Sequence, residues 1–144
     1  MIDIAPSNTH STEDLAREGW SVEPDDGFIG LVGPVWRAPD RFGHRYAFLA
    51  ESKHRNRRGV VQGGMLMTFA DRAMGGAARN NDPAIKQATV QLNVDFIDAA
   101  WLGNIVEIDC EVMRRTRTII FVRGRLFEKQ RLIATSHGIW KILA

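Results

Sequence analysis

The sequence predicts an α+β fold in which a long, curved antiparallel sheet wraps around one central buried helix. The helix is indicated by residues 62–79, which have two glycines at positions 63 and 64, contain no proline and carry apolar or small side chains on nearly every side. The sheet is indicated by the chain from residue 87 onward, where apolar and polar side chains alternate over long runs. A helix that is apolar all round needs a cover, and the apolar face of a sheet needs a partner. Each surface therefore buries the other.

Shorter elements precede this helix. Residues 1–10 are expected to form a polar arm, and Ser11 with Asp14 resembles a capping box that starts a short helix over residues 12–18. A single domain is expected over residues 1–144, with the arm and short helix as its first 20 residues.

Two strands are expected between the short helix and the long one. The apolar run 28–32 predicts a strand that ends at Gly33 and Pro34. Residues 45–51 predict the second strand, which leads through a basic loop into the long helix.

The C-terminal part of the chain predicts four strands that are longer than average. In the first of them, Val90, Leu92 and Val94 share the apolar face with Phe96, whereas Thr89 lies on the polar face. Tight turns at 101–104 and 129–130 predict that successive strands pair as an antiparallel meander. The expected strands span residues 87–97, 104–114, 118–128 and 132–143.

Composition excludes several classes of protein. The 144 residues carry 19 Lys and Arg against 17 Asp and Glu, and a net charge of +2 is too small to indicate nucleic-acid binding. The single Cys110 excludes an internal disulfide and favours a cytoplasmic protein. No apolar run is long enough to predict a membrane span. The scattered histidines lack metal-ligand spacing, so neither a metal nor another cofactor is predicted.

Asp71 is the most unusual residue of the sequence, because it places a carboxylate on the apolar helix. Met67, Ala70 and Met74 flank it at helical spacing. A carboxylate in such surroundings needs a partner or a chemical purpose.

The chain resembles the hotdog-fold acyl-CoA thioesterases of the phenylacetate pathway. Members of that family carry the pattern H-x-N-x-x-G-x-x-H-G-G before a helix that contains Asp or Glu. The corresponding stretch here is HRNRRGVVQGG, which begins at His54 and ends at Gly64, with Asp71 at the spacing of the family's catalytic carboxylate. The segments GFIGLVGPVWR, QATVQLNVDFIDAA, VMRRTRTIIFVRGRLF and LIATSHGIWKI also look like family strands. One departure is plain, because Gln62 occupies the position of the histidine before the glycine pair.

The resemblance implies a role for each residue of the motif. Asp71 would act as general base or nucleophile, and Asn56 would orient the water or the carbonyl. The amides of Gly63 and Gly64, at the positive end of the helix dipole, would stabilise an oxyanion. Structural alternatives remain for each: the glycines permit a sharp turn, Asp71 pairs with an arginine or with backbone amides, and Asn56 is a turn residue. Thr89 falls where related enzymes place a hydroxyl that contacts the carboxylate or the water.

The resemblance also implies the substrate and the partners. Acyl-CoA with a small or medium acyl group, including an aromatic one, is the expected substrate, and coenzyme A would enter only as part of it. Arginine side chains suit its phosphates. A homodimer with a shared site is expected, or a tetramer built from such dimers. The expected substrate-binding residues are His54, Arg57, Arg58, Gln62, Arg114, Arg115 and Arg117.

Two other functions stay open at this point. A non-catalytic acyl-CoA-binding protein is the main alternative, and Gln62 favours it because an amide cannot titrate as histidine does. A hydratase or dehydratase of the same fold would need a histidine-containing acid/base pair in another motif, which the sequence does not show.

Overall fold

The computed structural model describes residues 11–144, so the predicted polar arm of residues 1–10 lies outside the described residues. Three α-helices occur in the described chain: α1 (Thr12–Arg17), α2 (Phe28–Val32) and α3 (Gly63–Ala78). Two 3-10 turns, η1 (Asp40–Phe42) and η2 (Ser52–His54), flank the third strand. The predicted cap of α1 is confirmed, because the Ser11 hydroxyl accepts a hydrogen bond from the Asp14 amide at 3.2 Å.

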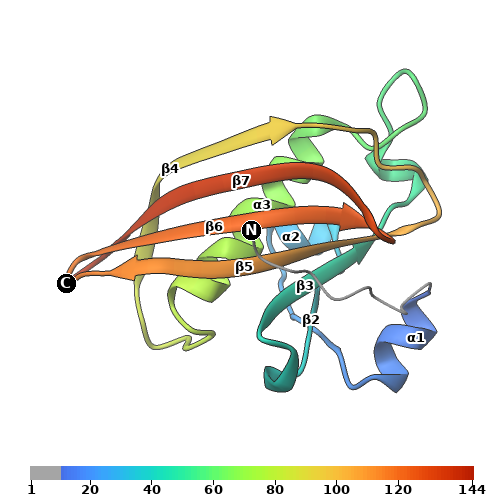
Figure 1. Cartoon of the computed structure of the whole chain (residues 1–144). Helices are drawn as coiled ribbons and strands as arrows, with labels where there is room; N and C mark the ends of the chain where they lie inside the picture. The colour runs from blue at the N-terminus through green and yellow to red at the C-terminus, as the bar shows by residue number, and fades with distance from the viewer. Residues whose placement is uncertain (1–10) are drawn as a thin grey trace.

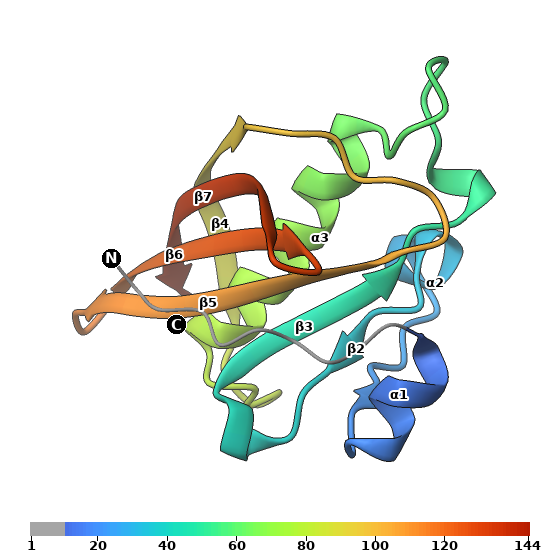
Figure 2. The ribbon, with the colours of Figure 1, turned by 45° about the vertical axis from the view of Figure 1, so that its right-hand side comes forward.

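A seven-stranded antiparallel sheet wraps around α3, as Figures 1 and 2 show. The predicted α+β architecture is therefore confirmed. The strands pair in the order β1-β2-β3-β5-β6-β7-β4. Their bounds are β1 (Ser21–Val22), β2 (Trp36–Arg37), β3 (His44–Leu49), β4 (Gln87–Phe96), β5 (Ile105–Arg115), β6 (Ile119–Glu128) and β7 (Arg131–Ile142).

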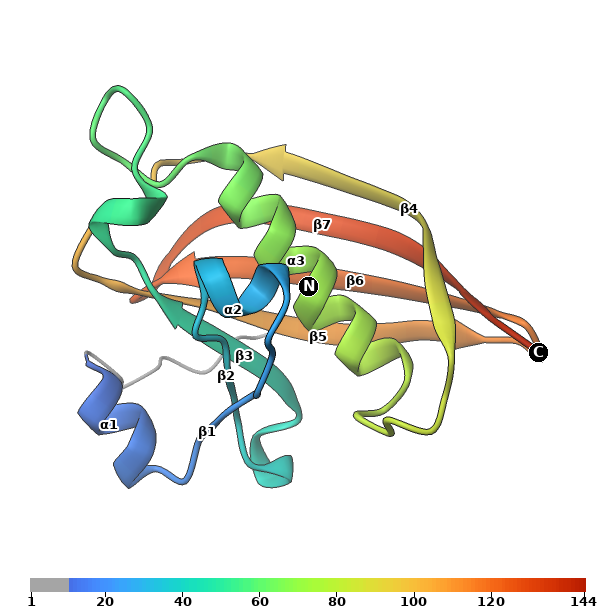
Figure 3. The ribbon, with the colours of Figure 1, turned by 180° about the vertical axis from the view of Figure 1, so that it is seen from behind.

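The main core lies between α3 and the sheet face that it crosses (Figure 3). Phe69 and Met74 of α3 are fully buried there against Ile108, Leu126 and Trp140 of the long strands. The predicted alternation also holds in β5 and β6, where alternate residues belong to this core: Val106, Ile108 and Cys110 of β5, and Ile120, Val122 and Leu126 of β6. A smaller cluster covers the opposite face of β3, where Leu15 of α1 and Trp20 pack against Ala47.

The predicted meander is wrong for β4. This strand pairs with β7 rather than with β5, whereas β5, β6 and β7 are consecutive neighbours. Residues 97–104 connect β4 to β5 across the end of the sheet, and a connection of this length does not force its two strands together as a tight turn would. Residues 97–104 therefore form a crossover connection, which we call the crossover segment. The turn at 101–104 is the end of this segment. The turn at 129–130 does join neighbouring strands.

The segment 28–32 is a helix and not the predicted strand. Its apolar residues stand at positions 28, 29, 31 and 32, a spacing that suits one side of a helical turn as well as a short strand. In α2 the side chains of Ile29 and Val32 pack against the main core, and those of Phe28 and Leu31 face outward with 63% and 74% exposure.

One stripe of α3 is uncovered, which corrects the expectation of a helix buried on every side. Met67 is 37% exposed, and Thr68, Asp71 and Arg72 are half-buried. Gly64, at the start of the helix, is exposed on the same side, because residues three, four and seven apart share a face. We call this uncovered surface the open stripe. It is the part of the helix that a substrate can reach, and it consists of Gly64, Met67, Thr68, Asp71 and Arg72.

Candidate active site

The first turn of α3 offers two backbone donors. Gln62 precedes the helix in an extended conformation, and its side-chain oxygen accepts a hydrogen bond from the Met65 amide at 3.1 Å. Within residues 11–144, neither the Gly63 amide nor the Gly64 amide donates a hydrogen bond to the protein. Both amides sit at the positive end of a 16-residue helix, where a developing negative charge is stabilised.

The two glycines also leave room for side chains that approach them closely. A Cβ atom at Gly63 would lie 3.3 Å from the ring of Phe96. A Cβ atom at Gly64 would lie 2.6 Å from the capping oxygen of Gln62. Neither glycine has a positive φ, so the turn alternative finds no support in the backbone, and the missing side chains instead make room for Phe96 and for the cap.

Asp71 is half-buried on the open stripe, so its carboxylate is less enclosed than the sequence predicted. The hydroxyl of Thr89 donates a hydrogen bond to its Oδ1 atom at 2.7 Å. The two residues line a cavity of about 180 Å³ together with Gly75, Gln87 and Trp140. Oδ2 has no protein partner among the described residues, which leaves one carboxylate oxygen for a water or a substrate.

A bulge in β4 brings Thr89 to Asp71. The register of β4 against β7 shifts between Thr89 and Gln91. Before the bulge Gln87 and Thr89 point to α3, whereas after it Leu92 and Val94 do so. Thr89 was placed on the polar face by strict alternation, and that placement is wrong because the extra residue reverses the two faces. The contact of Thr89 with Asp71 lies within one chain, as expected for a hydroxyl that contacts the carboxylate.

Arg72 was not singled out from the sequence, although it follows Asp71 directly and lines the same cavity. Its Nη1 atom lies 3.0 Å from Oδ2 of Asp25, in the acidic turn before α2. This ion pair engages the guanidinium next to Asp71, and Asp71 itself forms no ion pair with an arginine among residues 11–144. Only adjacency in the sequence could have drawn attention to Arg72, because its partner lies 47 positions away.

Asn56 stabilises its own loop. Its Oδ1 atom accepts hydrogen bonds from the amides of Arg58 at 2.8 Å and Val60 at 3.3 Å. The turn alternative therefore accounts for its side-chain oxygen. The side-chain NH₂ group remains as a donor, and Asn56 lines cavities of about 670 Å³ and 420 Å³ on two sides of the loop.

The predicted residues form two groups that are separated along α3. Asn56, Gly63 and Gly64 lie at the start of the helix, whereas Asp71 and Thr89 lie seven or more positions further on. Seven helical residues span about 10 Å at 1.5 Å per residue. Such a separation is too long for both groups of one chain to contact the same carbonyl.

His54 is a structural residue by its contacts. It is 3% exposed, its Nδ1 atom accepts a hydrogen bond from the Glu51 amide, and its Nε2 atom lies 2.6 Å from the carbonyl oxygen of Val32. Because a carbonyl only accepts, Nε2 carries the proton. Both ring nitrogens are thus engaged by backbone, although the ring borders a cavity of about 390 Å³ between α2 and the start of α3.

The predicted arginines fall into two separate places. Arg57 lines the 670 Å³ cavity with Lys53 and Arg55, and Arg58 lines the cavity of about 420 Å³. Arg114 and Arg115 end β5 and Arg117 follows in the turn to β6, at the opposite end of the sheet (Figures 1 and 3). One chain does not bring the two groups together.

The single cysteine is part of the packed interior. Cys110 is a free thiol in the core, and burial raises its pKa well above the ordinary value, as expected for an inert core cysteine.

Among residues 11–144, no helix is long and apolar enough to cross a membrane. The same residues contain no group of three His, Cys, Asp or Glu side chains that could hold a metal ion.

Comparison with known proteins decides the family. Residues 58–135, more than half of the chain, match the thioesterase superfamily. The chain belongs to this superfamily, and its fold is the hotdog fold. A Pseudomonas aeruginosa protein whose name proposes an esterase activity is 32% identical over 79% of this chain and 87% of its own length.

Two solved structures of similar fold bear on this family. The zebra fish thioesterase superfamily member 2 is 25% identical, with a TM-score of 0.72 over 83% of this chain and 88% of that one. A Streptococcus mutans protein solved with bound acetyl-CoA has a TM-score of 0.65 at 18% identity, over 69% of this chain and 80% of that one.

Proposed function

We propose that this thioesterase-superfamily protein hydrolyses acyl-CoA thioesters with a small or medium acyl group, including aromatic ones, as the phenylacetate-pathway branch does. The observation that carries the proposal is the open stripe of α3, which presents free amides at its start and a carboxylate held by Thr89 further on. The bound acetyl-CoA of the Streptococcus mutans relative supports coenzyme A as the thiol.

A second copy of the chain completes the proposed site. The separation of about 10 Å along α3 prevents one chain from using both groups on one thioester. In a dimer, Asp71 and Thr89 of one protomer would face Asn56, Gly63 and Gly64 of its partner. Strand β4 supports such pairing, because it is the last strand of the sheet, and Val90 and Phe96 on it are 59% and 53% exposed. Tetramers would form from these dimers.

The proposed reaction uses each group once. Asp71 takes a proton from a water bound at Oδ2, while Thr89 fixes the orientation of the carboxylate. The resulting hydroxide attacks the thioester carbon, and the Gly63 and Gly64 amides donate to the oxyanion. Collapse of the tetrahedral intermediate breaks the carbon–sulfur bond, and the thiolate of coenzyme A receives the proton held by Asp71. The NH₂ group of Asn56 orients the carbonyl or the water.

Basic loops supply the cations that coenzyme A needs. Lys53, Arg55 and Arg57 surround an open cavity beside the start of α3, where phosphate groups would be neutralised. Arg114, Arg115 and Arg117 could reach the same ligand only from a partner protomer. We further propose a cytoplasmic setting, where reducing conditions keep Cys110 a thiol.

The test is release of free thiol from a panel of acyl-CoAs by the wild type, Asp71→Asn and the matched control Asp40→Asn, an exposed carboxylate of η1. Removing the general base lowers kcat by a factor on the order of 100 or more, whereas the control keeps wild-type turnover. Full turnover by Asp71→Asn would show the mechanism to be wrong.

A non-catalytic acyl-CoA-binding protein is the second candidate. The side-chain oxygen of Gln62, at the position of the family histidine, is engaged in capping α3 and cannot titrate. Tight binding of acyl-CoA by calorimetry, with no thiol release above background for any member of the panel, would establish this function instead.

A further inference from the structure

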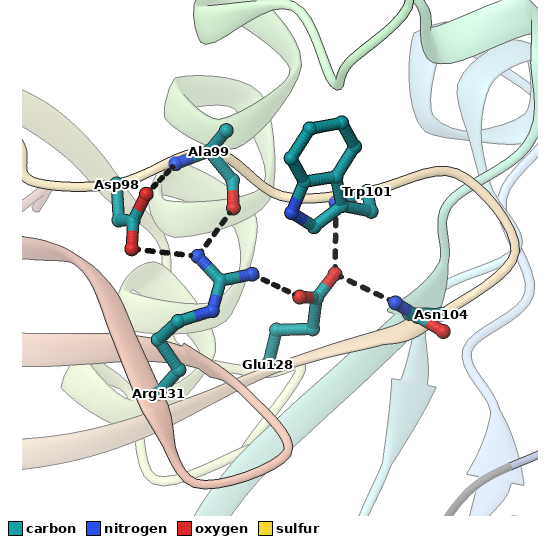
Figure 4. A network of polar contacts seen from close by, with 6 residues as sticks. All are labelled: Asp98, Ala99, Trp101, Asn104, Glu128 and Arg131. Atoms are coloured by element: carbon teal, nitrogen blue, oxygen red, sulfur yellow. Dashed lines mark hydrogen bonds and ion pairs between the residues drawn. The ribbon is translucent and has the colours of Figure 1, made fainter.

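The crossover segment, residues 97–104, runs past the start of α3 and is fixed by a polar network that the proposed mechanism does not use (Figure 4). The network joins three parts of the chain: the crossover segment, the last residue of β6 and the first residue of β7. Glu128 and Arg131 are its two central members, and both lie at the turn between β6 and β7.

Arg131 makes three contacts with its planar guanidinium. Nη1 lies 2.9 Å from Oδ2 of Asp98 and donates a hydrogen bond to the carbonyl oxygen of Ala99 at 2.8 Å. Nη2 donates to Oε2 of Glu128. The Asp98 carboxylate raises the pKa of Arg131, and the hydrogen bond from Arg131 lowers the pKa of Asp98. Lysine could not span these partners, because it carries a single ammonium point charge.

Glu128 fixes the second half of the crossover segment. Glu128 is only 4% exposed, and a carboxylate this buried requires partners on both oxygens. Oε1 accepts hydrogen bonds from the Trp101 amide at 2.8 Å and from Nδ2 of Asn104 at 3.1 Å. Oε2 faces Arg131, so both oxygens are satisfied.

The crossover segment in turn fixes the chain that leads into α3. The Val61 amide donates a hydrogen bond to the carbonyl oxygen of Ala100 at 2.9 Å, and Val60 forms a β-bridge with Trp101. Gln62 and the two glycines follow directly. A continuous series of short contacts thus links Arg131 and Glu128 to the first turn of the helix.

We propose that Glu128 and Arg131 are positioning residues for the hydrolysis. They act through the crossover segment on the orientation of the Gly63 and Gly64 amides. This inference rests on the proposed function. The chain provides a matched control: Arg123 of β6 pairs with Glu111 of β5 at 2.9 Å, with both side chains 43% exposed and no contact to the crossover segment. An ion pair that only holds strands together would behave like this control pair.

Steady-state kinetics of Arg131→Gln, Arg131→Lys and Arg123→Gln test the proposal on the full-length protein. A misaimed oxyanion site lowers kcat and leaves KM unchanged, because its hydrogen bonds form in the transition state. We expect Arg131→Gln to lose kcat by a factor on the order of 10 or more, Arg131→Lys to recover stability but not kcat, and Arg123→Gln to keep wild-type values. Equal kcat losses in Arg131→Gln and Arg123→Gln, or a raised KM with unchanged kcat, would overturn the inference.

Amide hydrogen exchange separates this inference from the proposed function. The Val61 amide loses protection in Arg131→Gln and keeps it in Arg123→Gln if the network fixes the start of α3. Unchanged Val61 protection in a folded Arg131→Gln variant refutes the inference even if the wild type is an active thioesterase. A wild type that hydrolyses no acyl-CoA, but whose Val61 amide responds to Arg131→Gln, refutes the proposed function and leaves the structural link standing.

Discussion

The two halves of α3 have opposite surroundings in the structure. From residue 73 to residue 78 every side chain is buried, and the carbonyl of Gly75 accepts a hydrogen bond from Nε2 of Gln87 at 2.6 Å. From residue 63 to residue 72 the helix keeps its open stripe, with Asp71 on it. The polar side chains Thr68, Asp71 and Arg72 all lie in the open half, so their spacing, rather than the apolar composition of the helix, marks the uncovered side.

The enclosed half is held by close packing and the open half by polar contacts at its start. A Cβ atom at Gly76 would lie 2.6 Å from the hydroxyl oxygen of Tyr46, which donates a hydrogen bond to Asn81. At the other end, backbone and side-chain hydrogen bonds through Ala100 and Gln62 set the first turn. Substitutions in the enclosed half should reduce stability, and those in the open half should reduce catalysis.

The largest stability difference is expected between two glycine-to-alanine substitutions on the same helix. Gly76→Ala forces the buried Tyr46 to move and should lower the free energy of unfolding by about 2 kcal/mol, even after the gain in helix propensity. Gly64→Ala meets only the flexible end of Gln62, so its effect should stay below about 1 kcal/mol. Urea denaturation measures both, and equal losses would show that the two halves are packed alike.

A smaller effect, on catalysis alone, is expected at Thr89. Thr89→Val removes the hydrogen bond to Asp71 with almost no change of shape, and we expect kcat to fall about tenfold, or about 1.4 kcal/mol, at unchanged stability. Thr89→Ser keeps the hydroxyl and should retain most of the activity. If Thr89→Val matches the wild type, the carboxylate does not need this orientation.

Local patterns made much of the fold predictable. The long helix and strands β5 to β7 were identified because their periodicity runs over ten or more residues, where helix and strand patterns differ clearly. The run at 28–32 is too short to separate the two. The faces of β4 depend on one bulged residue at Val90, and the pairing of β4 depends on where the crossover segment leads, so neither follows from alternation.

The candidate site, like the fold, was predictable only where its residues follow a local pattern. Gly63, Gly64 and Asp71 are readable because they lie on one helix at fixed spacing, and the motif resemblance identified them together. The partners Asp25 for Arg72 and Asp98 for Arg131 lie 47 and 33 positions away, and no pattern along the chain pairs them. The use of Asn56 in its own turn also became visible only through its bonds to the Arg58 and Val60 amides.

The smallest effect concerns acid, and it should separate the chain that leads into α3 from the enclosed half of the helix. Arg131 holds the pKa of Asp98 below its ordinary value of 3.8, so the folded state gains from this carboxylate above that pH and loses the gain as pH falls through the lowered value. In acid, the Val61 amide should therefore lose protection before the Ala78 amide in the enclosed half, whose surroundings are apolar. Asp98→Asn should show the weaker Val61 protection already at neutral pH and little further change on acidification. Hydrogen exchange over a pH series measures both amides, corrected for their intrinsic rates. Simultaneous loss at Val61 and Ala78 would mean that acid opens the whole domain at once, and that the start of α3 is no weaker than its end.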